Sequence, residues 1–70
     1  MRAIFNTDAA TLRRRLNSLA MEPANAVTIT TCAPDDGHFA IADGPVHHVM
    51  FLIGECANQG EDNLVCASVS

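Results

Sequence analysis

The feature that most constrains the fold is the stretch from Val46 to Ile53, which ends in five consecutive apolar residues and is closed by Gly54. An apolar run of this length fits either a strand that is covered on both faces or a buried helix. The shortness of the run, the Gly-Pro pair before it and its β-branched and aromatic content favour a strand. The stretch therefore predicts an inner strand of a β-sheet.

An amphipathic helix is predicted near the N-terminus, over residues 8–21. Leu12 and Leu16 belong to an apolar stripe with helical spacing, and arginines lie off that stripe. Thr7 is expected to cap the start of the helix, and Pro23 is expected to end it.

Three more strands are predicted from alternating apolar and polar residues and from the turn residues between them. With the inner strand, the predicted set is 26–32, 38–42, 46–53 and 64–69. The sequence thus predicts an α+β fold, with residues 1–70 forming a single compact domain. One N-terminal helix would pack on a four-stranded antiparallel meander, and Arg2-Ala3-Ile4-Phe5 leaves open a fifth strand. The predicted core comprises Leu12, Leu16, Leu19, Val49, Phe51 and Ile53.

Size and composition favour a binding protein over an enzyme. A chain of 70 residues buries a limited core and has little room to enclose a dry catalytic cleft. The three cysteines are odd in number and lack C-x-x-C spacing, which indicates a reducing compartment. Without a signal peptide or a membrane-length apolar run, the expected location is the cytoplasm of a bacterial host.

The charges are segregated along the chain. All four cations are arginines within the first fifteen residues, whereas residues 16–70 carry seven carboxylates and no Lys or Arg, a formal −7. Direct nucleic-acid binding needs a basic stripe or exposed aromatic platforms, so it is not expected. Arg13-Arg14-Arg15 is the only basic candidate, and a solvated helix face is the favoured interpretation of it.

Carboxylates are the main candidates for a functional surface. In the predicted meander, an even number of strand reversals separates the loop at residues 35–36 from the loop at residues 54–63, so both loops would lie at one end of the sheet. The predicted partner-binding residues, here called the acidic end, are Asp35, Asp36, Glu55, Glu61 and Asp62. Asp43 and Glu22 are secondary candidates. A simpler explanation of these carboxylates is that they lie in polar loops and keep a small protein soluble.

No catalytic, cofactor or metal motif is recognised. His47 and His48 are adjacent, so on a strand they would point to opposite faces and could not share one metal. Cys32, Cys56 and Cys66 are interpreted as small hydrophobic residues, because nothing in the sequence would activate a thiol. No enzyme activity, metal or cofactor is therefore expected.

In length, acidity and helix-plus-meander outline, the chain resembles the small phage-encoded anti-CRISPR inhibitor proteins, with no specific motif shared. Its lysine-free, alanine-rich composition fits a GC-rich bacterial host or its phage. The resemblance implies an inhibitor whose acidic surface mimics DNA. The chain itself is expected to be a monomer or a weak dimer. Its partner would be a protein with a basic nucleic-acid-binding surface, such as a Cas effector subunit. Two alternatives remain open: an assembly subunit that oligomerises through a sheet edge or apolar face, and a metal or redox regulator that uses the cysteines and histidines.

Overall fold

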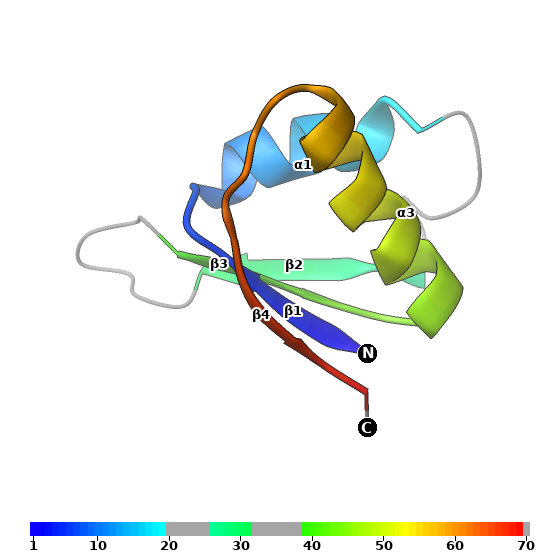
Figure 1. Ribbon diagram of the computed structural model, residues 1–70. Coiled ribbons are helices and arrows are strands. Elements are labelled where there is room, and N and C mark those ends of the chain that lie inside the picture. Colours follow the sequence, from blue (N-terminus) through cyan, green and yellow to red (C-terminus); the bar gives the residue numbers. More distant parts are fainter. Residues whose placement is uncertain (20–25, 32–38, 70) are drawn as a thin grey trace.

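The computed structural model describes residues 1–19, 26–31 and 39–69 (Figure 1). The elements follow one another as β1 (Arg2–Phe5), α1 (Ala9–Asn17), β2 (Thr28–Thr31), β3 (Ala40–Asp43), α3 (Val46–Asn58) and β4 (Leu64–Ser68). The four strands form one antiparallel sheet in the order β2-β3-β1-β4. The predicted α+β class, with an N-terminal helix and a four-stranded antiparallel sheet, is confirmed. This order of elements and strands is the split βαβ arrangement of ferredoxin-like folds.

Residues 46–53 are not a strand, however, because they form the first two turns of α3. The helix begins directly after Pro45, whose φ of −57° suits the start of a helix. It then continues through Gly54 to Asn58, although glycine is a weak helix former. The sequence predicts that the Gly-Pro pair is a turn before a strand, but the pair precedes a helix instead.

The buried residues of α3 show why the helical alternative wins. Val49, Leu52 and Cys56 are buried, and they follow one another at intervals of three and four residues. Phe51, which was predicted to lie in the core, is 44% exposed. This helical spacing can be recognised only when the residues after Gly54 are considered together with residues 46–53.

The fourth strand of the sheet is the N-terminal one. β1 lies between β3 and β4, with Phe5 opposite Ala40 on one side and Leu64 on the other. The pairing with β4 shifts between Ile4 and Phe5, so Val65 is the extra residue of a β-bulge. The predicted meander order of the strands is thus wrong, because β1, from the N-terminal part of the chain, lies between β3 and β4.

The first helix was predicted more accurately. It ends at Asn17, with Ser18 as its C-cap, four residues before the predicted end at residue 21. Asp8, not Thr7, is its N-cap: Asp8 Oδ1 accepts a hydrogen bond of 2.6 Å from Thr11 N. The remaining strands fall within two residues of their predicted limits, where those limits are described. Residues 20–21, 32 and 38 of the predicted elements lie outside the described residues.

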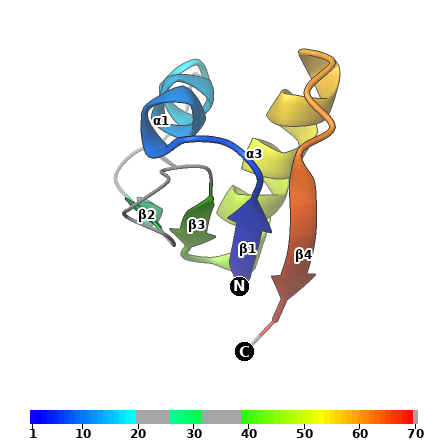
Figure 2. The same cartoon turned by 90° about the vertical axis from the view of Figure 1, so that its left-hand side faces the viewer.

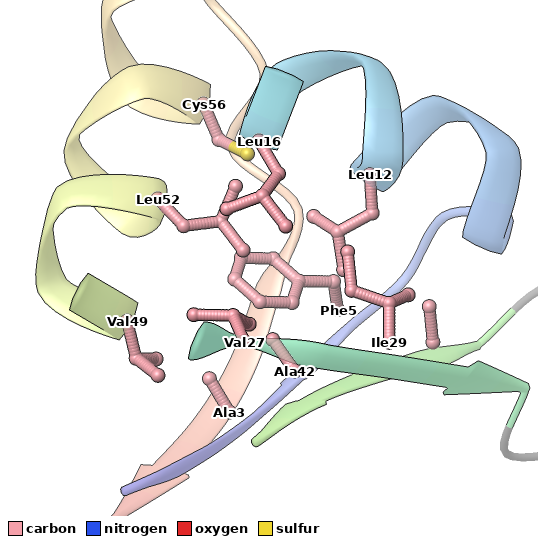
Figure 3. Close-up of a cluster of buried hydrophobic side chains, with 11 residues drawn as sticks. Ala3, Phe5, Leu12, Leu16, Val27, Ile29, Ala42, Val49, Leu52 and Cys56 are labelled. Carbon is pink, nitrogen blue, oxygen red and sulfur yellow. The ribbon is translucent and has the colours of Figure 1, made fainter. Parts of the chain in front are cut away.

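Both described helices pack on the same face of the sheet (Figures 1 and 2). α1 contacts α3, β2 and β3. α3 lies on the side of the sheet formed by β1 and β4 (Figure 2). Between the helices and the sheet, the ring of Phe5 occupies the centre of the core (Figure 3). The buried apolar residues around it are Ala3, Leu12, Leu16, Val27, Ile29, Ala40, Ala42, Val49, Leu52 and Cys56.

Candidate functional site

Exposed apolar side chains are concentrated on one part of the described surface. All the large ones belong to α3, to β4 or to the residue that follows β4: Val46, Met50, Phe51, Leu64, Val65 and Val69. Contiguous apolar patches are uncommon on monomeric proteins and mark interaction sites when they occur. This part of the molecule is therefore the leading candidate for a binding surface.

The hydrogen bonds of α3 show which of its sides is free. Glu55 faces α1, because its Oε2 accepts a hydrogen bond of 3.0 Å from Ser18 Oγ. At about 100° per residue, the positions farthest from Glu55 around the helix axis are 46, 50, 53 and 57. These positions hold Val46, Met50, Ile53 and Ala57, an apolar stripe beside the buried one; Val46, Met50 and Ala57 are exposed, whereas Ile53 is partly buried and packs against the core. The stripe lies on the side of α3 away from Glu55 and α1. β4 likewise lies at the edge of the sheet away from α1 (Figure 2).

β4 contributes the second half of this surface. It is an edge strand of the sheet, and all five of its residues are exposed. An edge strand leaves a row of backbone N–H and C=O groups unpaired, and proteins usually protect such an edge with charged residues or proline. The sequence of β4, Leu-Val-Cys-Ala-Ser, contains neither. We call the apolar flank the surface formed by the stripe Val46, Met50, Ile53 and Ala57 of α3 together with Leu64–Ser68 of β4.

The acidic end is only partly within the described residues, since Asp35, Asp36 and Glu22 lie outside them. The strand register nevertheless bears on its location. Thr31, Ala40, Phe5 and Leu64 all lie at the same end of the sheet, because Ala40 pairs with both Thr31 and Phe5, and Phe5 pairs with Leu64. Glu61 and Asp62 come just before Leu64 and therefore lie toward this end of the sheet, whereas residues 32–38 lie outside the described residues.

Among the described acidic residues, Glu61 has an intramolecular role. Its carboxylate accepts two hydrogen bonds from the Arg15 guanidinium, 2.6 Å from Nε and 2.9 Å from Nη2. Because Arg15 lies on α1 and Glu61 lies between α3 and β4, the pair holds α1 against the end of α3. The bonds from Arg15 keep the pKa of Glu61 below its usual value, and the same bonds raise the pKa of Arg15.

The other candidate carboxylates have different surroundings. Glu55 lies on α3 rather than in a loop, and it accepts hydrogen bonds from Ser18 Oγ and, at 3.1 Å, from Gln59 Nε2. Asp62 is exposed. Asp43 lies at the opposite end of the sheet, where it pairs with Arg2 at 3.1 Å. The structure thus brings Glu55 and Glu61 toward the same arginine and places Asp43 elsewhere.

The face of the sheet opposite the helices is open in the described part of the molecule. A shallow hollow on it is lined by Arg2, Thr28, Thr30, Ile41 and Asp43. Ferredoxin-like sheets that bind RNA do so on this face, with aromatic side chains that stack on bases. The central strands β1 and β3 carry no aromatic residue there, since the ring of Phe5 points into the core. Base stacking therefore has no platform on these two strands.

The arginines of α1 are engaged within the molecule. Arg13 Nη2 donates a hydrogen bond of 3.1 Å to the carbonyl oxygen of Ile29 in β2, and Arg14 Nη2 donates one of 3.2 Å to Thr11 Oγ1. The Arg13 bond and the Arg15 pair connect α1 to the rest of the fold, whereas the Arg14 bond lies within α1. They give the basic run a structural role, which composition alone did not reveal.

The cysteines and histidines form no recognisable reactive centre in the described residues. Cys56 is buried, and burial raises the pKa of its thiol, whereas Cys66 is exposed on β4. The rings of His47 and His48 lie 4.1 Å apart on the same helix. Within the described ranges, no three His, Cys, Asp or Glu side chains are close enough together to hold a metal ion. Cys32 lies outside those ranges.

Comparison with known proteins identifies no relative: no protein family, no curated protein and no solved structure matches this chain significantly. Among the described residues, neither helix has the length and apolar character needed to cross a membrane. The function must therefore be argued from the surface itself.

The sequence-based search for a site missed the apolar flank, although a signal for it was present. Val46, Met50, Ile53 and Ala57 follow one another at intervals of four, three and four, which is helical spacing. A strand covered on both faces, as predicted for residues 46–53, has no such stripe, so the strand prediction conceals this spacing.

Proposed function

We propose that this chain is a non-enzymatic protein-binding module that assembles with its partner through the apolar flank. One observation carries the proposal: Val46, Met50 and Ala57 of α3 and all five residues of the edge strand β4 are uncharged and exposed, and β4 lies on the side of the molecule away from α1. Exposed apolar surface of this kind is costly in water, and a partner that covers it gains binding free energy. An assembly subunit is therefore the function that the geometry supports best.

The flank offers two modes of contact that reinforce each other. The free edge of β4 can accept one more strand through backbone hydrogen bonds, as in recognition by β-augmentation. The stripe on α3 then provides a surface against which side chains of the partner pack. We place this activity in the cytoplasm of a bacterial host, as the composition predicts.

A second candidate function is the acidic inhibitor that the sequence predicted, which would dock on a basic nucleic-acid-binding protein such as a Cas effector subunit. What supports it is the excess of carboxylates, since residues 16–70 carry seven of them and no Lys or Arg, and Asp62 is exposed. Glu61 contributes less than expected to such a surface, because Arg15 neutralises its charge. Asp35, Asp36 and Asp62 would then be the main contacts.

The two functions are distinguished by capturing proteins from a bacterial lysate with matched variants. Met50→Glu places a charge in the apolar flank, whereas Phe51→Glu places the same charge on the side of α3 that is turned toward Glu55. The acidic end is tested by Asp35→Lys combined with Asp36→Lys and Asp62→Lys. Glu61 is left intact in this triple variant because it also holds α1 in place.

If the apolar flank is the binding surface, a captured protein, including a differently tagged copy of this chain, is lost with Met50→Glu and retained with Phe51→Glu. High salt changes the capture little, since burial of apolar surface is not screened. If the acidic end binds, the triple lysine variant and high salt each abolish capture instead. Equal capture by wild type and Met50→Glu refutes the leading proposal. Circular dichroism on every variant checks that it is folded.

A further inference from the structure

We infer that the partner that fits the apolar flank is a second copy of this chain, with β4 paired antiparallel to β4 of the partner about a two-fold axis perpendicular to the sheet. The inference rests on the proposed function, because it requires the flank to bind protein. The pairing would join two four-stranded sheets into one continuous eight-stranded sheet. Two-fold pairing of identical surfaces is the commonest form of protein dimer.

The register of the two strands follows from symmetry. Antiparallel pairing overlaps most fully when the two-fold axis passes the middle residue of Leu64–Ser68, which is Cys66. Leu64 then lies opposite Ser68 of the second copy, and Cys66 lies opposite its own equivalent. Facing residues in antiparallel strands have Cα atoms about 4.5 or 5.5 Å apart. Both separations lie within the range of about 4.4–6.8 Å that a disulfide spans.

The same axis brings the two helix stripes together. A two-fold axis perpendicular to the sheet keeps the helices of both copies on the same face, so α3 lies beside α3 of the second copy. Because α3 lies on the β1–β4 side of the sheet (Figure 2), α3 of the second copy would be its neighbour across the joined β4 strands. The exposed Val46 and Met50 could then be covered by the same residues of the partner.

Charge does not oppose this arrangement. β4 and the stripe on α3 contain no charged residue, although the chain as a whole has a formal charge of −4. The nearest exposed carboxylate along the chain is Asp62, two residues before β4. In the antiparallel register, Asp62 and its equivalent lie at opposite ends of the interface, about 26 Å apart along the strands. This exceeds the Debye length of about 8 Å at physiological salt, so their repulsion is screened.

The area is also sufficient. Val46, Met50, Leu64, Val65 and Val69 are each between 39% and 70% exposed. Two copies would bury on the order of 900 Å² from these residues, just below the roughly 1,000 Å² of a specific interface. Ala57, Cys66 and the backbone of β4 add to this figure.

The opposite edge of the sheet is a poorer surface for the same purpose. β2 carries three threonines among its four residues, and the Arg13 guanidinium on α1 donates a hydrogen bond to the carbonyl oxygen of Ile29 within it. A charged group beside an edge strand hinders the approach of another strand. The geometry therefore points to β4 as the pairing edge.

The first test is the mass of the purified chain in solution, measured by light scattering over a range of concentrations. We expect twice the 7.4 kDa of one chain at high concentration, with dissociation on dilution. Met50→Glu should shift the dissociation constant upward at least tenfold, and Phe51→Glu should leave it within about twofold. Ala57→Glu, in the exposed last turns of α3, serves as a second flank variant if Met50→Glu does not fold.

The second test is specific for the register. In a Cys32→Ser background, diamide takes up two electrons and two protons from two Cys66 thiols and leaves a disulfide between the copies. We expect this cross-link to form rapidly in the Cys32→Ser protein and to be lost when Cys66→Ser is added. If the Cys32→Ser protein is dimeric by light scattering but diamide forms no cross-link through Cys66, the β4 pairing is refuted.

A chain that stays monomeric at all concentrations overturns the inference as a whole. The proposed function survives that result if another protein is still captured in a manner that Met50→Glu abolishes. If Met50→Glu changes neither the mass of the assembly nor the capture of any protein, both proposals fail. The two failures are therefore distinguishable.

Discussion

Replacement of Phe5 by alanine is the sharpest test of the fold, because the sequence alone placed a different phenylalanine in the core. Phe5 is fully buried at the centre of the core, whereas Phe51 is 44% exposed on α3 (Figure 3). The same substitution at the two positions therefore separates the observed helix from the strand that the sequence predicted. The comparison is matched in chemistry and differs only in burial.

The expected magnitude follows from burial and cavity formation. Removing a fully buried phenylalanine side chain costs about 3–5 kcal/mol, which includes the lost transfer free energy and the cavity left behind. A chain of 70 residues has a stability of about 3.5–10 kcal/mol in total. Phe5→Ala is thus expected to lower the melting temperature by about 15–30 °C or to prevent folding.

Phe51→Ala should behave differently. Solvent fills the space that the ring vacates, so no cavity forms, and alanine is a better helix former than phenylalanine. We expect a loss within about 1 kcal/mol, which corresponds to a few degrees in the melting temperature. Phe5→Leu, which keeps most of the volume, should lie between the two alanine variants.

Thermal unfolding followed by circular dichroism measures all three variants. The protein concentration must be held constant, because dimer formation raises the melting temperature in a concentration-dependent way. If Phe5→Ala does not fold, the comparison rests on Phe5→Leu. A melting temperature for Phe51→Ala that is clearly below that of Phe5→Leu would refute the assignment of the core.

Three further predictions concern local features of the fold. Arg15 keeps the pKa of Glu61 below its value in the unfolded chain, so the pair stabilises the fold at pH values above the unfolded pKa. This contribution is lost as the pH falls through the folded pKa. Glu61→Gln should therefore have a lower melting temperature than wild type at pH 7, and the two melting temperatures should converge in acid. Gly54→Ala should raise the free energy of unfolding by about 0.5–1 kcal/mol, because no atom lies within 4 Å of the added methyl group. Gly44→Ala should lower the free energy of unfolding, because a backbone carbonyl oxygen lies 2.8 Å from the new Cβ. Asp8→Ala should lower the free energy of unfolding, measured by chemical denaturation, by about 1 kcal/mol through loss of the helix cap, and Asp8→Asn should lower it much less. Equal losses for the two variants would contradict the role of the Asp8 side chain as a hydrogen-bond acceptor.

The sequence by itself determined the local features that depend on neighbouring residues. The stripe that contains Leu12 and Leu16 predicted the first helix, because side chains three and four positions apart always share one face of a helix. The alternation in the region of Ile29 predicted β2, since a strand with one covered face needs apolar residues at every second position. The α+β class follows from these elements.

Only the tertiary structure decided the state of residues 46–53 and the place of β1. An apolar run shows that a segment is buried, but it does not show whether a sheet or a helix layer covers it. Here β1 pairs with both β3 and β4, so the position beside β3 that the predicted strand would have taken is filled from the N-terminus. The run is then free to form α3 above the sheet. The partners of Arg15 and β4 likewise depend on contacts between distant segments, which no local pattern encodes.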